Sequence, residues 1–147
     1  MNSQPLVIEQ LIDAPVTRVW DALTKNEQMK QWYFELPDFR AVPGFEFIFI
    51  AGAKGDVQYK HICKVTQVVP KKKLSYSWRY DGYPGDSLVT LELFEEGEHT
   101  RLKLTHAGLE TFASAGPDFS REKFAEGWAQ IVGKSLKGFL ETEPARA

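Results

Sequence analysis

Three side chains in the sequence have the chemistry of metal ligands or catalytic groups. His61 and Cys63 lie two positions apart, so in a strand both point to the same face of a sheet, whereas His106 lies much further along the chain. Imidazole and thiolate groups bind zinc at about 2.1–2.3 Å, and a thiolate beside a positive group is a nucleophile. If consecutive strands are neighbours, however, two strands separate His106 from the other pair, which is roughly 14 Å at about 4.8 Å per strand. We therefore predict no metal site.

The remaining reactive groups do not define a catalytic site. Cys63 is the only cysteine, so an intramolecular disulfide is excluded, and a lone buried cysteine usually behaves as a small apolar residue. Glu9, Glu35 and Asp38 are acidic candidates for the interior, but no pair of carboxylates has a spacing that indicates an acid or base role. We therefore assign no catalytic residue and predict no cofactor.

Aromatic residues are the most informative part of the composition. The 147 residues include ten Phe, five Tyr and four Trp, which is more ring surface than a domain of this size needs to close its core. Tyr and Trp also carry a polar group that needs a partner when it is buried. We predict that inward rings line a cavity for a hydrophobic or aromatic small molecule, with His61, Tyr80 and His106 as polar contacts. The predicted ligand-binding residues are Trp32, Phe34, Phe47, Phe49, His61, Cys63, Tyr76, Trp78, Tyr80, Leu91, His106, Phe124 and Trp128.

The chain before residue 45 predicts one strand and two short helices. Residues 6–12 alternate as in a strand, and Pro15 suits the first position of a helix. The apolar residues that follow recur at i, i+3, i+4 and i+7, which is one stripe of a helix of about three turns. A second short helix is expected over residues 27–32, and prolines mark the loop after it. The stripe of the first helix consists of Val16, Val19, Trp20 and Leu23.

From Phe45 onward the apolar period changes from 3.6 to 2, which predicts five strands separated by turn residues. Their short connections require antiparallel neighbours, because a parallel crossover needs a dozen or more residues. Alternation gives each strand one apolar face and one face of Lys, Arg, Glu and Ser, so we expect a sheet with one dry side. The expected strands are residues 45–51, 57–69, 73–80, 87–95 and 99–106.

A long amphipathic helix ends the sequence and is expected to cover the dry side of the sheet. Ser120 is a suitable N-cap, Glu122 in the first turn favours the helix dipole, and the helix is expected to end near Leu140. A helix of about 20 residues is only about 30 Å long, so it cannot fill the whole concave side of a twisted six-stranded sheet. We therefore expect a gap between helix and sheet, bordered by Phe47, Trp78, His106 and Trp128. The expected inner face of the helix contains Phe124, Trp128, Ile131, Ser135 and Phe139, flanked by Val132 and Leu136.

Three segments, in this order, resemble the START-like (SRPBCC) superfamily, and within it the proteins related to the C-terminal domain of the activator of Hsp90 ATPase. They are residues 12–24 (IDAPVTRVWDALT) followed by Trp32, residues 65–78 (VTQVVPKKKLSYSW), and the pair Gly127-Trp128. The resemblance implies the helix-grip fold of the α+β class, in which a six-stranded curved antiparallel sheet, in the order β-α-α-β5-α, wraps around a long C-terminal helix. The superfamily includes lipid carriers, hormone receptors, polyketide cyclases and co-chaperone domains, so the resemblance implies the fold more narrowly than the function.

Charge and hydropathy restrict the location and the partners. The net charge is −2 with both signs spread along the chain, so the basic stripe of a nucleic-acid-binding protein is missing. No stretch approaches the about 20 apolar residues of a membrane span, and the N-terminus lacks the pattern of a signal peptide. We expect one domain over residues 1–147 that is cytoplasmic, binds no nucleic acid and does not span a membrane.

These observations leave three functional hypotheses open. The first is a binding or carrier domain for a hydrophobic or aromatic small molecule, held between the sheet and the C-terminal helix. The second, implied by the resemblance, is a co-chaperone-like module that contacts an Hsp90-type ATPase, and the third is a cyclase- or hydrolase-like enzyme that uses the same cavity. A second copy of the chain is a further candidate partner, because the edge strand over residues 45–51 turns Ile48 and Ile50 outward.

Overall fold

The computed structural model describes residues 5–32, 39–52, 58–112 and 121–142. Each strand within these ranges agrees with the sequence prediction to within a residue at either end. No helix in this part of the chain is long and apolar enough to cross a bilayer. The elements are β1 (Leu6–Ile12), α1 (Val16–Thr24), α2 (Asn26–Trp32), β2 (Glu46–Gly52), β3 (Gln58–Val69), β4 (Lys73–Tyr80), β5 (Ser87–Glu96), β6 (His99–Ala107), η1 (Leu109–Phe112), α3 (Arg121–Gln130), η3 (Ile131–Leu136) and α4 (Lys137–Thr142).

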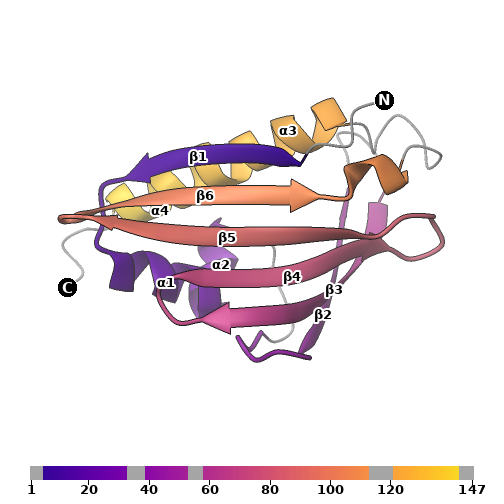
Figure 1. Cartoon of the computed structure of the whole chain (residues 1–147), viewed down its shortest axis with the longest axis horizontal. Coiled ribbons are helices and arrows are strands. Elements are labelled where there is room, and N and C mark those ends of the chain that lie inside the picture. Colours follow the sequence, from indigo (N-terminus) through magenta and orange to yellow (C-terminus); the bar gives the residue numbers. More distant parts are fainter. Residues whose placement is uncertain (1–4, 33–38, 53–57, 113–120, 143–147) are drawn as a thin grey trace.

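The six strands form one antiparallel sheet in the order β1-β6-β5-β4-β3-β2. The first strand therefore lies at one edge and the second at the other, and the chain passes through α1 and α2 between them. In Figure 1 the sheet is seen from its outer side, and the helices lie behind it. This arrangement confirms the predicted α+β, helix-grip architecture.

Side chains alternate between a dry inner face and a wet outer face, as strand geometry requires. On β5, for example, Val89 is fully buried whereas its neighbour Leu88 is exposed. Ser75 departs from the predicted pattern, because it is buried although it was expected on the wet face. Its hydroxyl donates to the carbonyl oxygen of Val89 at 3.2 Å. In β3 the pairing register shifts between Val65 and Gln67, and this bulge ends the regular alternation.

The two short helices pack against each other beside the sheet. Pro15 precedes α1 as its N-cap, with φ −70° and ψ 157°, one position before the place expected from the sequence. The indole of Trp32 in α2 donates to the carbonyl oxygen of Ala22 in α1 at 2.8 Å, which joins the two helices. Trp20, which the predicted apolar stripe included, is only half-buried. The buried residues of α1 are Val16, Val19, Ala22 and Leu23.

The C-terminal helix runs without a break from Arg121 to Thr142 but changes its winding in the middle. Its ends, α3 and α4, are α-helical, whereas η3 is a π-helix with i→i+5 hydrogen bonds. A π turn holds more residues than an α turn, so side chains four apart stay on one face. Ile131, Ser135 and Phe139, which we expected on the inner face, are therefore only half-buried. The buried side chains are Phe124, Trp128, Val132, Leu136 and Leu140.

The β4–β5 connection packs tightly on η1. Gly85 has a φ of +112°, and a Cβ atom added there would lie 2.3 Å from the ring of Phe112. The Thr111 hydroxyl accepts a hydrogen bond from the backbone N–H of Asp86 at 2.9 Å. These contacts hold the ring of Phe112 against Tyr80, with 5.5 Å between the ring centroids. The connection thereby positions one end of the aromatic cluster described next.

Candidate functional site

All predicted site residues except Phe34 lie in the described part of the chain, and each of them is buried. Phe34 lies outside the described residues. Strands β2 to β6 supply most of these side chains, and α2 and α3 supply the others. They are Trp32 of α2, Phe47 and Phe49 of β2, His61 and Cys63 of β3, Tyr76, Trp78 and Tyr80 of β4, Leu91 of β5, His106 of β6, and Phe124 and Trp128 of α3.

His61 is enclosed by three aromatic rings. Its imidazole stacks on Phe49 with 4.4 Å between the ring centroids, and it meets Tyr80 at 4.7 Å and Trp78 at 5.1 Å edge to face. Its Nδ1 atom lies 3.0 Å from the carbonyl oxygen of Tyr59. Burial lowers the pKa of His61 to about 4, so the ring is neutral at pH 7.

Trp78 connects the sheet to the C-terminal helix. Its ring centroid lies 5.3 Å from that of Trp128, and 5.8 Å from each of those of Phe49 and His106. Its Nε1–H donates to the phenol oxygen of Tyr80 at 2.8 Å. Burial raises the pKa of Tyr80, so this phenol stays protonated. Trp78, His106 and Trp128, which we expected to border a gap, thus contact one another directly.

A chain of three buried hydrogen bonds runs from the helix to the sheet. Trp128 Nε1 lies 3.0 Å from His106 Nδ1, and His106 Nε2 lies 2.8 Å from the hydroxyl of Ser87. That hydroxyl donates to the carbonyl oxygen of Trp78 at 2.8 Å. An indole N–H can only donate, so His106 accepts at Nδ1 and carries its proton on Nε2. Every bond in the chain therefore has one direction, from Trp128 through His106 and Ser87 to the backbone of Trp78.

Because of this hydrogen-bond direction, Ser87 and His106 cannot act as the nucleophile and general base that a serine beside a histidine suggests. A general base needs a lone pair facing the hydroxyl that it activates, but His106 presents an N–H to Ser87. Burial also lowers the pKa of His106 to about 3, which keeps the ring neutral at pH 7. The pair therefore positions the helix on the sheet and does not activate a nucleophile. Sequence reasoning missed Ser87, although strand alternation with Val89 places it on the dry face.

Cys63 is fully buried between Phe47 and Trp78, its partners on the two neighbouring strands. Burial raises the pKa of its thiol, so Cys63 is protonated at pH 7 and does not act as a thiolate. β4 and β5 separate the strands that carry His61 and His106, as predicted. Among the described residues, no three His, Cys, Asp or Glu side chains come together as a metal-binding group.

Two further rings belong to the cluster and were missed from the sequence. Phe39 packs edge-on against Phe47, with 5.2 Å between ring centroids. Phe112 stacks on Phe124 at 5.7 Å and is fully buried. Phe39 lies in a loop without any period, so no sequence signal marks it as buried. Phe112 follows Leu109 at the spacing of a helical turn, and that spacing was a usable signal.

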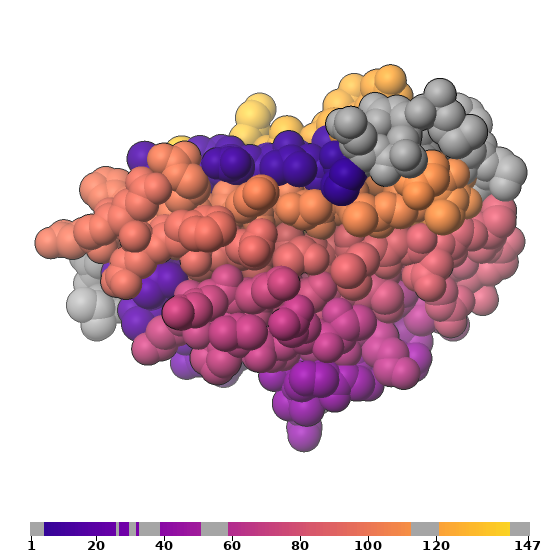
Figure 2. Space-filling view, in the orientation of Figure 1, coloured from indigo at the N-terminus to yellow at the C-terminus, as the bar shows by residue number. Residues whose placement is uncertain are grey.

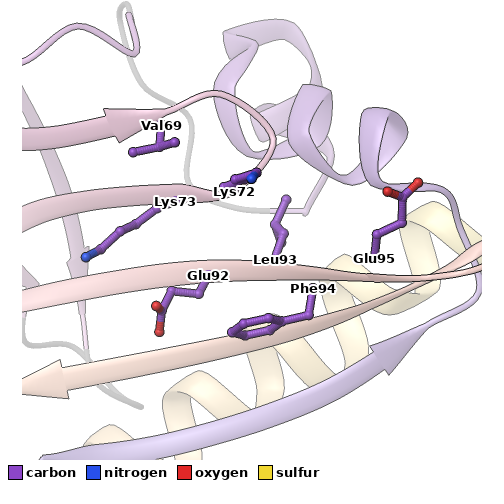
Figure 3. Close-up of a pocket in the computed structure, with 7 residues that line it drawn as sticks. All are labelled: Val69, Lys72, Lys73, Glu92, Leu93, Phe94 and Glu95. Atoms are coloured by element: carbon purple, nitrogen blue, oxygen red, sulfur yellow. The ribbon is translucent and has the colours of Figure 1, made fainter.

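A groove of about 560 Å³ lies on the outer side of the sheet and is lined by none of the aromatic-cluster residues (Figure 3). The groove forms where the β3–β4 hairpin separates from β5. The last contacts between them are the strand pair Lys73 and Glu92 and a hydrogen bond of 2.9 Å from the N–H of Leu93 to the carbonyl oxygen of Lys72. Lysine and glutamate side chains face it in equal number, so it favours neither cations nor anions. Figure 2 shows this outer side, with β1, β6, β5 and β4 in order from the top. The groove is lined by Val69, Lys72, Lys73, Glu92, Leu93, Phe94 and Glu95.

A six-stranded sheet that grips a long C-terminal helix around a buried ring cluster defines a START-like domain. Residues 13–141 match the family model described as Activator of Hsp90 ATPase homolog 1-like protein, and the chain belongs to this family. The match begins directly after β1, ends within α4, and confirms the resemblance noted in the sequence.

Solved structures with the same fold include proteins from several bacteria. CalU16 from Micromonospora echinospora is 31% identical, with a TM-score of 0.67, over 97% of this chain and 79% of that chain. Protein MLL2253 from Mesorhizobium loti is 26% identical, with a TM-score of 0.76, over 95% of this chain and 98% of that one. DynU16, a protein of the dynemicin biosynthetic locus, is 24% identical with a TM-score of 0.75, and the match covers 96% of this chain but only 48% of DynU16. No curated protein matches the chain.

Proposed function

We propose that this chain binds an uncharged aromatic small molecule beside the aromatic cluster that joins the inner face of the sheet to the C-terminal helix. The observation that carries the proposal is the ring cluster itself, in which Phe49, His61 and Trp78 of the sheet adjoin Trp128 of the helix. Ring faces and edges of this kind recognise other rings by offset stacking and edge-to-face contact. Small-molecule sites combine such apolar walls with a few polar groups.

The electrostatics of the interior favour a neutral ligand. The buried polar residues among those described are His61, Ser75, Ser87, Thr100 and His106, and none of the buried side chains is Lys, Arg, Asp or Glu. Both buried histidines are neutral at pH 7, because burial lowers the pKa of His61 to about 4 and that of His106 to about 3. A ligand carboxylate or ammonium group would therefore enter without a counter-charge, at a cost of several kcal/mol in a low-dielectric interior.

One structural neighbour comes from a biosynthetic locus. DynU16 is a protein of the dynemicin biosynthetic locus, and CalU16 shares the fold. A small-molecule ligand for this chain is in keeping with that setting.

Binding can be tested with matched probes and matched variants. The purified protein is titrated with a neutral polycyclic aromatic compound and with its carboxylate analogue, and binding is followed by quenching of tryptophan fluorescence and by native mass spectrometry. We expect the neutral compound to bind at least about tenfold more tightly, a difference of about 1.4 kcal/mol. Phe49→Leu should weaken binding, whereas Phe94→Leu on the outer face, 46% exposed, should not. Equal effects of the two variants, or preference for the carboxylate, would contradict the proposal.

A second candidate function rests on the family match. The family model is named for an activator of the Hsp90 ATPase, so contact with an Hsp90-type ATPase is the alternative role. This role predicts that the protein raises the turnover of a purified Hsp90-type ATPase and co-elutes with it. If turnover and elution are unchanged with excess protein, the chaperone role is eliminated while the ligand proposal stands.

A further inference from the structure

Strand β2 presents an edge whose backbone groups point away from the rest of the sheet. It is the last strand in the sheet order, and β3 is its neighbour on the other side. The N–H of Val65 donates to the carbonyl oxygen of Phe45 at 2.8 Å. The backbone N–H and C=O groups of the odd-numbered residues of β2 therefore point toward β3. Hydrogen-bonding direction alternates along an antiparallel strand, so Glu46, Ile48 and Ile50 direct their N–H and C=O groups outward.

Two of the three outer side chains on this edge are apolar, although sheet edges are usually protected. Proteins commonly block edge strands with charged residues or proline, because an open edge pairs with other chains. Here Ile48 is 39% exposed and Ile50 is 66% exposed, the highest value among the large apolar side chains described. Ile48 pairs with Ile62 on β3, and Ile50 pairs with Lys60. Ile62 and its pair partner Ile48 therefore extend an apolar surface to the edge of the sheet.

We propose that β2 pairs antiparallel with β2 of a second copy of the chain, about a twofold axis at Ile48. In this register Ile48 lies opposite its own copy and Glu46 lies opposite Ile50, so only outward-directed residues face each other. The three pairs would form about six hydrogen bonds. The outer face would then carry a row of four isoleucines, formed by Ile62 and Ile48 of each copy.

The charges at the rim are self-complementary in this register. Glu46 pairs with Lys64 of its own β3, and Ile50 pairs with Lys60. Across the axis the row therefore reads Lys64, Glu46, Ile50 of the second copy and Lys60 of the second copy. Each Glu46 then adjoins its own Lys64 and faces Lys60 of the second copy across Ile50. A shift that places Glu46 opposite Ile48 would instead bring the two Glu46 side chains to diagonal positions about 7–8 Å apart, where they repel. The charges thus favour the register centred on Ile48.

A cysteine scan tests the pairing and its register. Opposite residues of a hydrogen-bonded pair are about 5.5 Å apart between Cα atoms, which a disulfide spans, so Ile48→Cys should form a covalent dimer under mild oxidation. Glu46→Cys should not, because the two copies of that position are roughly 14 Å apart. Leu88→Cys is the matched control, since Leu88 is 39% exposed, as Ile48 is. Cys63 is fully buried and is present in every variant, so the unaltered protein controls for it.

Sedimentation tests the same contact without a cross-link. We expect the unaltered protein to dimerise with rising concentration, and Ile48→Lys to raise the dissociation constant at least about tenfold by placing like charges opposite each other. Glu46→Lys and Lys60→Glu should each weaken the dimer, and their combination should restore it. Circular dichroism checks that each variant is folded. A monomer at all concentrations, a dimer unaffected by Ile48→Lys, or equal cross-linking at Ile48 and Leu88 would overturn the proposal, and none of these outcomes depends on ligand binding.

Discussion

Lowering the pH from 7 to 5 should destabilise this protein by about 4 kcal/mol through two buried imidazoles. Burial lowers the pKa of His61 to about 4 and that of His106 to about 3, from an ordinary value of 6.5. Between these values the unfolded chain binds a proton at each histidine and the folded chain does not. Stability is therefore fully present above about pH 6.5 and declines as the pH falls toward the folded-state values.

The magnitude follows from proton linkage. For one histidine with these pKa values, the difference in proton binding between pH 7 and pH 5 amounts to about 2 kcal/mol. Two histidines give about 4 kcal/mol, which is a large part of the about 5–15 kcal/mol that stabilises a typical domain. At a urea m-value of about 2 kcal/mol per molar, the unfolding midpoint should fall by about 2 M.

Urea unfolding at pH 7, 6 and 5, followed by tryptophan fluorescence, measures this shift. His61→Gln and His106→Gln should each lose about half of the pH dependence, although both also lower stability at pH 7. His99→Gln removes the exposed imidazole at the start of β6 and is the matched control. This variant should still show the fall in stability between pH 7 and pH 5 that the two buried histidines cause. An unchanged midpoint between pH 7 and pH 5, or full pH dependence in His106→Gln, would refute the reasoning.

Three further predictions concern single positions. Gly85→Ala should cost about 3 kcal/mol, because it combines a strained φ with overlap onto a ring of η1, whereas Gly82→Ala, with φ +80° and open space around it, should cost only about 1 kcal/mol; urea midpoints separate the two. Lys71→Asn should raise the free energy of unfolding by up to about 1 kcal/mol, because Lys71 has a φ of 64° that asparagine tolerates better, and a lower melting temperature would contradict this. Ser87→Ala should cost about 1–3 kcal/mol and leave the Nε2 proton of His106 without its acceptor, so ¹⁵N-edited spectra should show that proton exchanging faster than in the parent.

The sheet was predictable because its signal is local. In β4, for example, apolar and polar residues alternate from Lys73 to Tyr80, and a period of two leaves only one choice of buried face. The inward positions of Cys63, Trp78 and His106 follow from that rule alone. Short turns then determine which strands are neighbours, so the distance between the two buried histidine strands was predictable as well.

The features that escaped prediction depend on contacts distant in sequence. The π turn at η3 has no composition signal, and its effect is to bury Leu136 and Leu140 in place of Ser135 and Phe139. The hydrogen bond from His106 to Ser87 joins residues 19 positions apart, and predicting it required the register of β5 and β6. Ring-to-ring contact across the interior depends on side-chain packing, which a face assignment does not determine.

The π turn also makes the length of the C-terminal helix locally adjustable. Removing Gly133 would convert the segment to ordinary α-helix and advance each later residue by one position. Leu136 and Leu140 would then occupy places 135 and 139, which lie on the same side of a straight α-helix as Phe124 and Trp128. These four side chains would reach the interior from a helix one residue shorter. The π turn therefore corresponds to one extra residue in the helix, and removing that residue should leave the side chains that the sheet grips unchanged.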